Sequence, residues 1–264
     1  MALTFCSFSS GSSGNCYLIR SEESAILVDA GISGRKIFRA LASVEVDPPD
    51  VSAVLITHEH SDHVRSLKTI ARKMPHIRAC ANSGTWKNIG SLVAEKQRAV
   101  FQTGEPFYIN DIKVNSFPLS HDAEEPVGFS FYKGDKQISI LTDTGFLSGE
   151  IYEEIKGADL LVLEANHDVD MLRIGKYPWF LKQRILGHKG HLSNVDAAEA
   201  ICRILSEKQK YIHVLLAHLS RENNFPEMAY QTIKNLLEEK NYYIDTNICL
   251  NIIGRDEMSA LYTV

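Results

Sequence analysis

The stretch AVLITHEHSDHV, residues 53–64, places three histidines and two acids within six positions, directly after a run of apolar residues. Alternate residues of a strand point to the same side, so His58 and His60 can bind one metal ion. Asp62 and His63 come one turn later, where we expect the chain to bend into a helix, and they can bind a second ion. Imidazole and carboxylate groups together suit zinc, iron or manganese. The alternative is a polar surface turn without a ligand, and the density of ligand-type side chains argues against it.

A dinuclear metal site needs more ligands than this turn offers, and three other apolar runs each end in a suitable side chain. These are His121 in FPLSHD, Asp143 in SILTDTG and His218 in HVLLAHLS. Each of them alone could be an ordinary polar residue at the end of a strand. Together they predict a set of seven ligands in which Asp143 bridges two ions. The first ion would take His58, His60, His121 and Asp143, and the second would take Asp62, His63, Asp143 and His218.

The composition is that of a globular protein without a membrane segment. The 264 residues are 44% hydrophobic and 23% charged, which fits a single domain over residues 1–264. No apolar run is long enough to cross a bilayer, and the N-terminus lacks the pattern of a secretory signal. Five scattered cysteines without a CxxC pair predict reduced thiols and a cytoplasmic protein. The net charge of −5 means that any nucleic-acid contact requires a local basic patch.

Hydrophobic periodicity predicts an alternation of strands and helices along the chain. We expect strands at 3–8, 16–20, 25–30, 52–57, 79–82, 99–102, 106–109, 112–119, 127–133, 137–143, 159–165 and 213–218. We expect helices at 33–42, 64–73, 83–93, 148–156, 179–186, 194–206 and 226–240. Ser33 is placed to cap the first of these helices. This order of elements fits two sheets that are covered by helices on their outer faces.

In its motifs the chain resembles the metallo-β-lactamase superfamily. The pattern HxHxDH, followed in order by a histidine, an aspartate and a histidine, is the signature of that superfamily. The resemblance implies a four-layer αββα sandwich with the metals between the sheet edges. It also implies that Asp29, in AILVDAG, supports the histidine turn without binding metal. The β-lactamases themselves carry cysteine where this chain has Asp143, and a carboxylate there fits thioester, lactone and phosphodiester hydrolases.

Further motifs resemble the bacterial YycJ/WalJ group, which is similar to RNase Z and RNase J. They are SSGSSGN, LVDAGISGRKI, ITHEHSDHV, LSHDA, LTDTG, EANHD, GHLSN and LAHLSREN. The Ser/Gly run taken alone reads equally well as a hairpin turn, and Cys16 departs from the small polar residue common in the group. The resemblance implies a 5′→3′ exonuclease that acts on DNA. It also implies two divalent ions per chain, zinc or manganese, with iron also feasible.

Two residues correspond to groups that assist proton transfer in RNase Z-like enzymes. They are Glu164 in LLVLEAN and His191 in KGHLSN. Histidine titrates near neutrality, so His191 can protonate a leaving alkoxide. Asp62 would orient the attacking water or accept its proton. Alternatively, His191 is a bystander beside a helix cap at Ser193 or Asn194.

Residues 173–195 contain five Lys or Arg and no acid, with aromatic residues interleaved. Basic groups meet phosphates and aromatic faces stack on unpaired bases, so we expect this segment to bind nucleic acid, in particular DNA. The candidate substrate-binding residues are Lys182, Arg184, Lys189 and, just past His218, Arg221. The alternative is an amphipathic helix with Trp179 in the core and its lysines in water.

The main alternative to a nuclease is a glyoxalase-like thioesterase or lactonase, because such enzymes use the same seven ligands. The basic aromatic segment and the GHLSN motif favour the nuclease. RNase J itself fits less well, because the gap between Asp143 and His218 is too short for its inserted domain. A flavin-dependent electron-transfer member would need a further domain for which no residues remain.

Overall fold

The computed structural model describes residues 2–208 and 210–264. The strands form two seven-stranded sheets, in the orders β14-β1-β2-β3-β4-β5-β6 and β13-β12-β11-β10-β9-β8-β7. The chain divides into two compact units, which we describe one at a time. Unit 1 comprises Met1–Pro118, Ala123–Gln137 and Gly254–Val264, and unit 2 comprises Leu119–Asp122 and Ile138–Ile253. The prediction of a single domain remains a prediction.

Unit 1 contains the first sheet and an antiparallel three-stranded meander. The first sheet consists of β1 (Thr4–Ser9), β2 (Cys16–Arg20), β3 (Ala25–Val28), β4 (Val51–Leu55), β5 (Arg78–Ala81), β6 (Arg98–Val100) and β14 (Tyr262–Thr263). The meander consists of β7 (Phe107–Ile109), β8 (Ile112–Pro118) and β9 (Val127–Lys133). The helices are α1 (Gly34–Ser43), α2 (Ser61–Val64), α3 (Leu67–Lys73) and α4 (Ser83–Ile89), with short 3₁₀ turns at Pro48–Asp50, Gly90–Leu92 and Glu95–Gln97.

The core of unit 1 forms where α1 and α3 bury their apolar sides against the sheet. Ile37 and Leu41 of α1 are four residues apart, so they lie on one helix face, and both belong to the same buried cluster as Val54 of β4. Ser33 caps α1, as the sequence predicts, because its hydroxyl accepts a hydrogen bond from the Lys36 backbone N–H at 3.3 Å.

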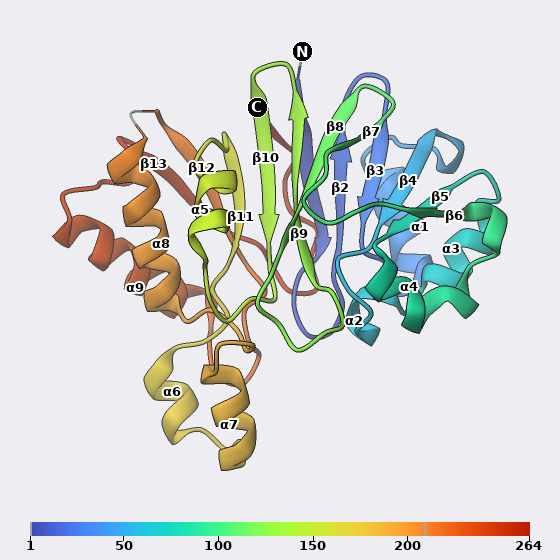
Figure 1. Cartoon of the computed structure of the whole chain (residues 1–264). Coiled ribbons are helices and arrows are strands. Elements are labelled where there is room, and N and C mark those ends of the chain that lie inside the picture. The colour runs from blue at the N-terminus through green and yellow to red at the C-terminus, as the bar shows by residue number, and fades with distance from the viewer. Residues whose placement is uncertain (1, 209) are drawn as a thin grey trace. The chain divides into compact units, whose positions relative to one another are not determined.

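Unit 2 is built on parallel strands. Its elements are β10 (Lys136–Leu141, in this unit from Ile138), α5 (Gly149–Ile155), β11 (Leu160–Glu164), α6 (Val169–Ile174), α7 (Trp179–Leu186), α8 (Asn194–Glu207), β12 (Ile212–Ala217), α9 (Pro226–Glu239) and β13 (Ile248–Ile252). Strands β10 to β13 pair in parallel, and β11 is buried throughout, as is typical of a sheet covered on both faces. Within this unit, α6 and α7 lie apart from α8 and α9 (Figure 1).

Strand register in unit 2 brings distant parts of the sequence to one edge. Leu141 pairs with Leu163, and Glu164 pairs with Ala217, so β10, β11 and β12 end side by side. The carboxyl ends of neighbouring parallel strands meet at the same sheet edge, where open α/β sheets bind ligands. Asp143 and His218 follow directly at that edge, next to Glu164.

Most predicted elements are present, and α7 has the predicted bounds. The expected helix at 64–73 is wrong in its start, because a separate turn of helix, α2, already begins at Ser61 and α3 follows only at Leu67. The periodicity of the sequence does not predict α6, β13 or β14. No helix among residues 2–208 and 210–264 is both long and apolar enough to span a membrane.

Candidate metal centre

The histidine turn of unit 1 gathers its three imidazoles at the end of β4. The ring centroid of His58 lies 4.6 Å from that of His60 and 4.0 Å from that of His63. His58 and His63 are buried, whereas His60 is half-buried. Asp62 lies on the same turn, with one carboxylate oxygen 3.7 Å from His63 Nε2. The four ligands that the sequence predicts for this turn are therefore close together.

Asp29 supports the turn, as the resemblance implies. Its Oδ2 lies 2.8 Å from His63 Nδ1, and its Oδ1 accepts the Thr57 backbone N–H at 2.9 Å. Burial raises the pKa of Asp29, against the opposing effects of His63 and the Thr57 hydrogen bonds. A carboxylate at Nδ1 fixes the orientation of the His63 ring, as is usual for a histidine that binds metal through Nε2.

The Ser/Gly loop contributes Asn15, a residue that sequence reasoning does not identify. Its Nδ2 lies 3.0 Å from His63 Nε2, and its backbone N–H donates to the Asp62 carbonyl at 2.8 Å. Gly31 packs against the same turn so closely that a Cβ would lie 1.6 Å from the Asp62 carbonyl oxygen. The motifs SSGSSGN and VDAG therefore serve the histidine turn. Apart from the family resemblance, their signal in the sequence is their glycine and asparagine content.

In unit 2, a second cluster surrounds Glu164. Asp143, Glu164, His191 and His218 each offer one ligand atom, and these four atoms lie within 4.8 Å of one another. Glu164 is fully buried, and its Oε1 lies 2.8 Å from both His191 Nδ1 and His218 Nδ1. Its Oε2 accepts the Thr144 backbone N–H at 2.9 Å. The sequence-predicted pair Glu164 and His191 is therefore in direct contact.

The opposite charges of Glu164 and His191 stabilise each other. Burial alone would raise the pKa of Glu164, but His191 and the hydrogen bonds from His191 and His218 lower it to about 2. Burial lowers the pKa of His191, and the adjacent Glu164 outweighs it and raises this pKa to about 9. The cap of α8 is formed by Ser193, whose side chain accepts from the Asp196 backbone N–H in a capping box. His191 has its own contact with Glu164 and takes no part in that cap.

His121 belongs to the same unit and lies beside the turn at residues 187–190. Its Nδ1 lies 3.2 Å from the Gly190 carbonyl oxygen, and its Nε2 lies 4.0 Å from Asp143 Oδ1. Burial lowers the pKa of His121, so the neutral imidazole that metals require is favoured. His121, Asp143 and His218 thus lie together in unit 2.

Three of the predicted histidine ligands share one arrangement. The Nδ1 atom of His63, His121 and His218 faces a carboxylate or a carbonyl oxygen, at 2.8, 3.2 and 2.8 Å. Metal-binding histidines usually donate their second N–H to such an acceptor, which sets the tautomer. The donor set of both units therefore fits divalent metal ions.

The backbone at these sites is unusual. Asp29, Asp143 and His218 follow strands β3, β10 and β12 and have φ values of 61°, 63° and 56°. Left-handed backbone costs free energy for residues other than glycine, and it persists at functional sites where the surroundings enforce it. Each of these residues carries a ligand-type side chain just past the end of its strand.

Comparison with known proteins assigns the family. Residues 24–214 match a family model described as a beta-lactamase superfamily domain. This chain belongs to the metallo-β-lactamase superfamily. Its two mixed sheets with flanking helices are the αββα sandwich that the sequence predicts.

Two curated relatives place the chain more narrowly within the superfamily. It is 41% identical over 245 residues to an exodeoxyribonuclease YycJ of Bacillus anthracis, covering 92% of each chain. It is 44% identical over 236 residues to an exodeoxyribonuclease WalJ of Streptococcus pneumoniae, covering 87% of this chain and 86% of the relative. A solved structure, the metallo-β-lactamase fold protein YhfI of Bacillus subtilis, shares the fold with a TM-score of 0.75 at 14% identity, over 98% of this chain and 99% of that one. The family prediction is therefore confirmed, and the chain is a hydrolase of this superfamily.

The basic residues predicted to bind substrate are not all exposed. Lys182 is buried, and its Nζ donates to the Arg173 carbonyl oxygen at 2.7 Å. Arg184 contacts Asp122 with both Nε and Nη2 at 2.6 Å. Lys189 and Arg221 are exposed. Trp179 is exposed as well, so the alternative that places it in the core is wrong.

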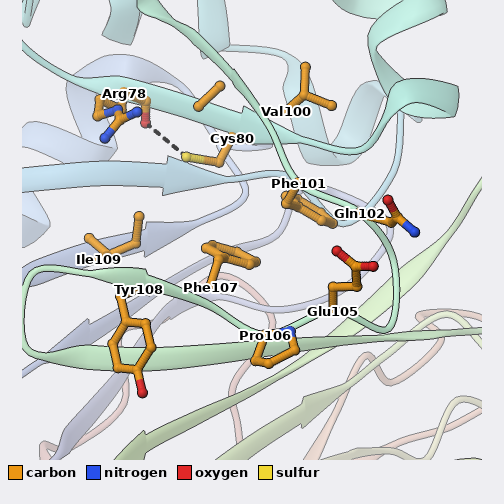
Figure 2. A pocket seen from close by; sticks show the side chains of 11 residues that line it. Arg78, Cys80, Val100, Phe101, Gln102, Glu105, Pro106, Phe107, Tyr108 and Ile109 are labelled. Atoms are coloured by element: carbon orange, nitrogen blue, oxygen red, sulfur yellow. Dashed lines mark hydrogen bonds between the residues drawn. The ribbon is translucent and has the colours of Figure 1, made fainter.

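A pocket elsewhere in unit 1 lacks the chemistry of the superfamily's metal centre. It has a volume of about 300 Å³ and lies between β5, β6 and the strand β7, as Figure 2 shows. Phe101 and Phe107 stack in it with ring centroids 5.1 Å apart. Burial raises the pKa of its Cys80 thiol to about 11, so this group is protonated at neutral pH.

Proposed function

We propose that this chain is a metal-dependent exodeoxyribonuclease that hydrolyses DNA in the 5′→3′ direction in the cytoplasm. The observation that carries the proposal is the identity of 41–44% to two exodeoxyribonucleases over most of both chains. The clusters of both units support it, because they retain every ligand-type side chain of the superfamily signature. The five cysteines are free thiols, which supports a reducing compartment.

The proposed cofactor is a pair of divalent ions, zinc or manganese, with iron also feasible. The proposed ligands are His58, His60, Asp62, His63, His121, Asp143 and His218. When bound, such ions activate water and stabilise the charge that develops on a scissile phosphate. The Nδ1 contacts of His63, His121 and His218 support this set, because they fix the orientation of each ring.

Proton transfer is proposed for His191 and Glu164, which are outside the proposed ligand set, and for the ligand Asp62. His191 would donate a proton from Nε2 to the leaving oxygen, since its Nδ1 is held by Glu164. Glu164 would keep His191 protonated and oriented. Asp62, which is partly exposed beside His63, would orient the attacking water or accept its proton.

Substrate contacts are proposed on the exposed cations. Lys189 and Arg221 would meet phosphates directly. Arg184 could do so only in addition to its contact with Asp122. For Lys182, the contact with the Arg173 carbonyl supports a structural part in holding the segment that the DNA meets.

The test is hydrolysis of DNA labelled at the 5′ end, with metal content measured on the same preparation. We expect release of nucleotides with 5′-phosphates, dependent on added manganese or zinc and abolished by chelator. Parallel assays with RNA, a thioester and a lactone separate the nuclease from the small-substrate hydrolases of the superfamily. Turnover of the thioester or lactone without cleavage of DNA would contradict the proposal.

A further inference from the structure

Helices α6 and α7 of unit 2 expose three large apolar side chains, one at the end of α6 and two at the start of α7. Ile174, Trp179 and Phe180 are 85%, 65% and 72% exposed, and we call these three residues the aromatic tip. The two helices lie apart from α8 and α9, which pack beside each other (Figure 1). An exposed apolar group of this size, next to basic residues, indicates a binding surface.

The charge around the aromatic tip favours an anionic ligand. Residues 173–195 carry five Lys or Arg and no acid. Of these, Lys182 is buried against the Arg173 carbonyl and Arg184 is paired with Asp122. Arg173, Lys176 and Lys189 are exposed. Duplex DNA is recognised largely through many phosphate contacts. Exposed aromatic side chains beside exposed cations are typical of sites that stack unpaired bases while cations follow the backbone.

We propose that the aromatic tip binds an unpaired DNA strand by stacking its bases on Trp179 and Phe180. A duplex must then fray at its end before it is cut. The proposal rests on the proposed exodeoxyribonuclease function and names the form in which the substrate is held.

Helix α7 begins at the aromatic tip. At its other end, the turn at residues 187–190 leads into the cluster around Glu164. The His191 backbone N–H donates to the Ile185 carbonyl at 3.0 Å, and the Ser120 hydroxyl donates to the His188 carbonyl at 2.7 Å. Gly190 is packed so closely that a Cβ would lie 2.1 Å from the Ile185 carbonyl oxygen. The last turn of α7 therefore fixes the main chain of His191. A strand held on α7 is thus held on the helix whose last turn contacts the main chain of the proposed acid.

The length of α7 determines how long an oligonucleotide must be to gain affinity from the aromatic tip. The helix is eight residues long, so its two ends lie roughly 10 Å apart at about 1.5 Å per residue. This length corresponds to about three stacked bases at about 3.4 Å each. Longer oligonucleotides should therefore gain affinity from the aromatic tip, whereas a single nucleotide ester should not.

The experiment compares three variants with the wild-type protein. Trp179→Ala/Phe180→Ala removes both rings, and Trp179→Phe/Phe180→Tyr keeps two aromatic faces. Tyr243→Ala removes an exposed aromatic side chain from the same unit, outside residues 173–195, and serves as the matched control. Substrates are a labelled single strand, the same sequence as a blunt duplex, a duplex with a mismatched end, and thymidine 5′-p-nitrophenyl phosphate.

We expect the alanine pair to lower kcat/KM for the single strand and for the mismatched end by about 10- to 100-fold, the scale of one or two lost stacking contacts. Hydrolysis of the nitrophenyl ester should stay unchanged, and so should the salt dependence of DNA binding, because no phosphate contact is lost. The wild type should cut the mismatched end faster than the blunt end, and the alanine pair should lose this preference. The aromatic pair should restore it.

Binding without turnover gives an independent measurement. A phosphorothioate oligonucleotide should quench the fluorescence of the wild type, and Trp179→Phe should lose that quenching. Equal kcat/KM for the single strand in the wild type and the alanine pair would overturn the inference while leaving the nuclease intact. Quenching by the oligonucleotide without any DNA cleavage would instead refute the proposed function and keep the stacking site. A fluorescence change with anionic phospholipid vesicles, and none with the oligonucleotide, would overturn the inference in favour of a membrane-binding surface.

Discussion

His191 Nδ1 lies 2.8 Å from Oε1 of the fully buried Glu164. As the proposed general acid, His191 would therefore donate its proton to the leaving oxygen from Nε2. We predict that His191→Ala binds DNA with near-normal affinity but cleaves it about 10²-fold more slowly or worse, which is the usual scale for a lost general acid. The measurement is single-turnover cleavage beside equilibrium binding. The loss should shrink for an ester with a good leaving group, and an equal loss on both substrates would contradict the assignment.

Oε1 of Glu164 contacts both His191 and His218. We therefore expect metal affinity to depend on the charge of Glu164 more than on its size. We predict that Glu164→Gln lowers metal affinity by about 10- to 100-fold, the range found when an acceptor behind a metal-bound histidine is lost. Competition with a chromogenic chelator measures this affinity apart from activity. Glu239→Gln, an exposed change of the same charge, is the matched control. Unchanged metal affinity in Glu164→Gln would show that Glu164 does not act through His218.

Asp143 is the proposed bridge, with Oδ1 at 3.5 Å from His218 Nε2 and 4.0 Å from His121 Nε2. We predict that Asp143→Ala abolishes hydrolysis and lowers the metal content per chain, because both ions lose a ligand. Elemental analysis after loading with manganese or zinc, next to circular dichroism, checks this outcome. If the variant retains near-wild-type hydrolysis, the bridge is misassigned. A wild-type chain that never holds more than one ion would contradict the pair of ions.

The basic segment should separate into structural and phosphate-binding residues. We predict that Lys182→Ala lowers thermal stability, because the Arg173 carbonyl loses its buried donor. Any change in DNA binding by this variant should result from that loss of structure. Lys189→Ala should leave stability unchanged and reduce the slope of log K against log salt by roughly 0.7 to 0.9 per lost phosphate contact. Melting curves and binding titrations at several salt concentrations distinguish the two. An unchanged slope for Lys189→Ala would make that residue a solvated surface lysine.

Acid stability should depend on Asp111. Partial burial would raise its pKa, but hydrogen bonds from Lys133, Ser24 and Ser21 lower it from 3.8 to about 2. A lowered folded-state pKa stabilises the protein above the unfolded value, and this contribution is lost as the pH falls through the folded value. We predict that wild type exceeds Asp111→Asn in stability above about pH 4 and that the difference disappears towards pH 2. Urea denaturation across this range measures it, and a constant difference would contradict the prediction.

The sequence alone predicts the superfamily, the αββα sandwich and the ligand-type residues of the candidate centre. It does so because HxHxDH directly after an apolar strand constrains geometry locally: the strand period and the following turn fix where four side chains can point. Strand-end positions of Asp143 and His218 are also local features, visible as one polar residue that closes an apolar run.

Tertiary structure decides the contacts that no local pattern encodes. The approach of Asn15 to His63 and the shared contact of Glu164 with His191 and His218 join residues 27 to 54 positions apart, and they depend on strand register and close backbone packing. The same holds for charge. Lys182 and Arg184 look like a phosphate-binding surface in the sequence, yet the fold buries one and pairs the other. Periodicity in the sequence indicates which residues share one face of a helix or strand. Only the folded structure determines which partner each polar group contacts.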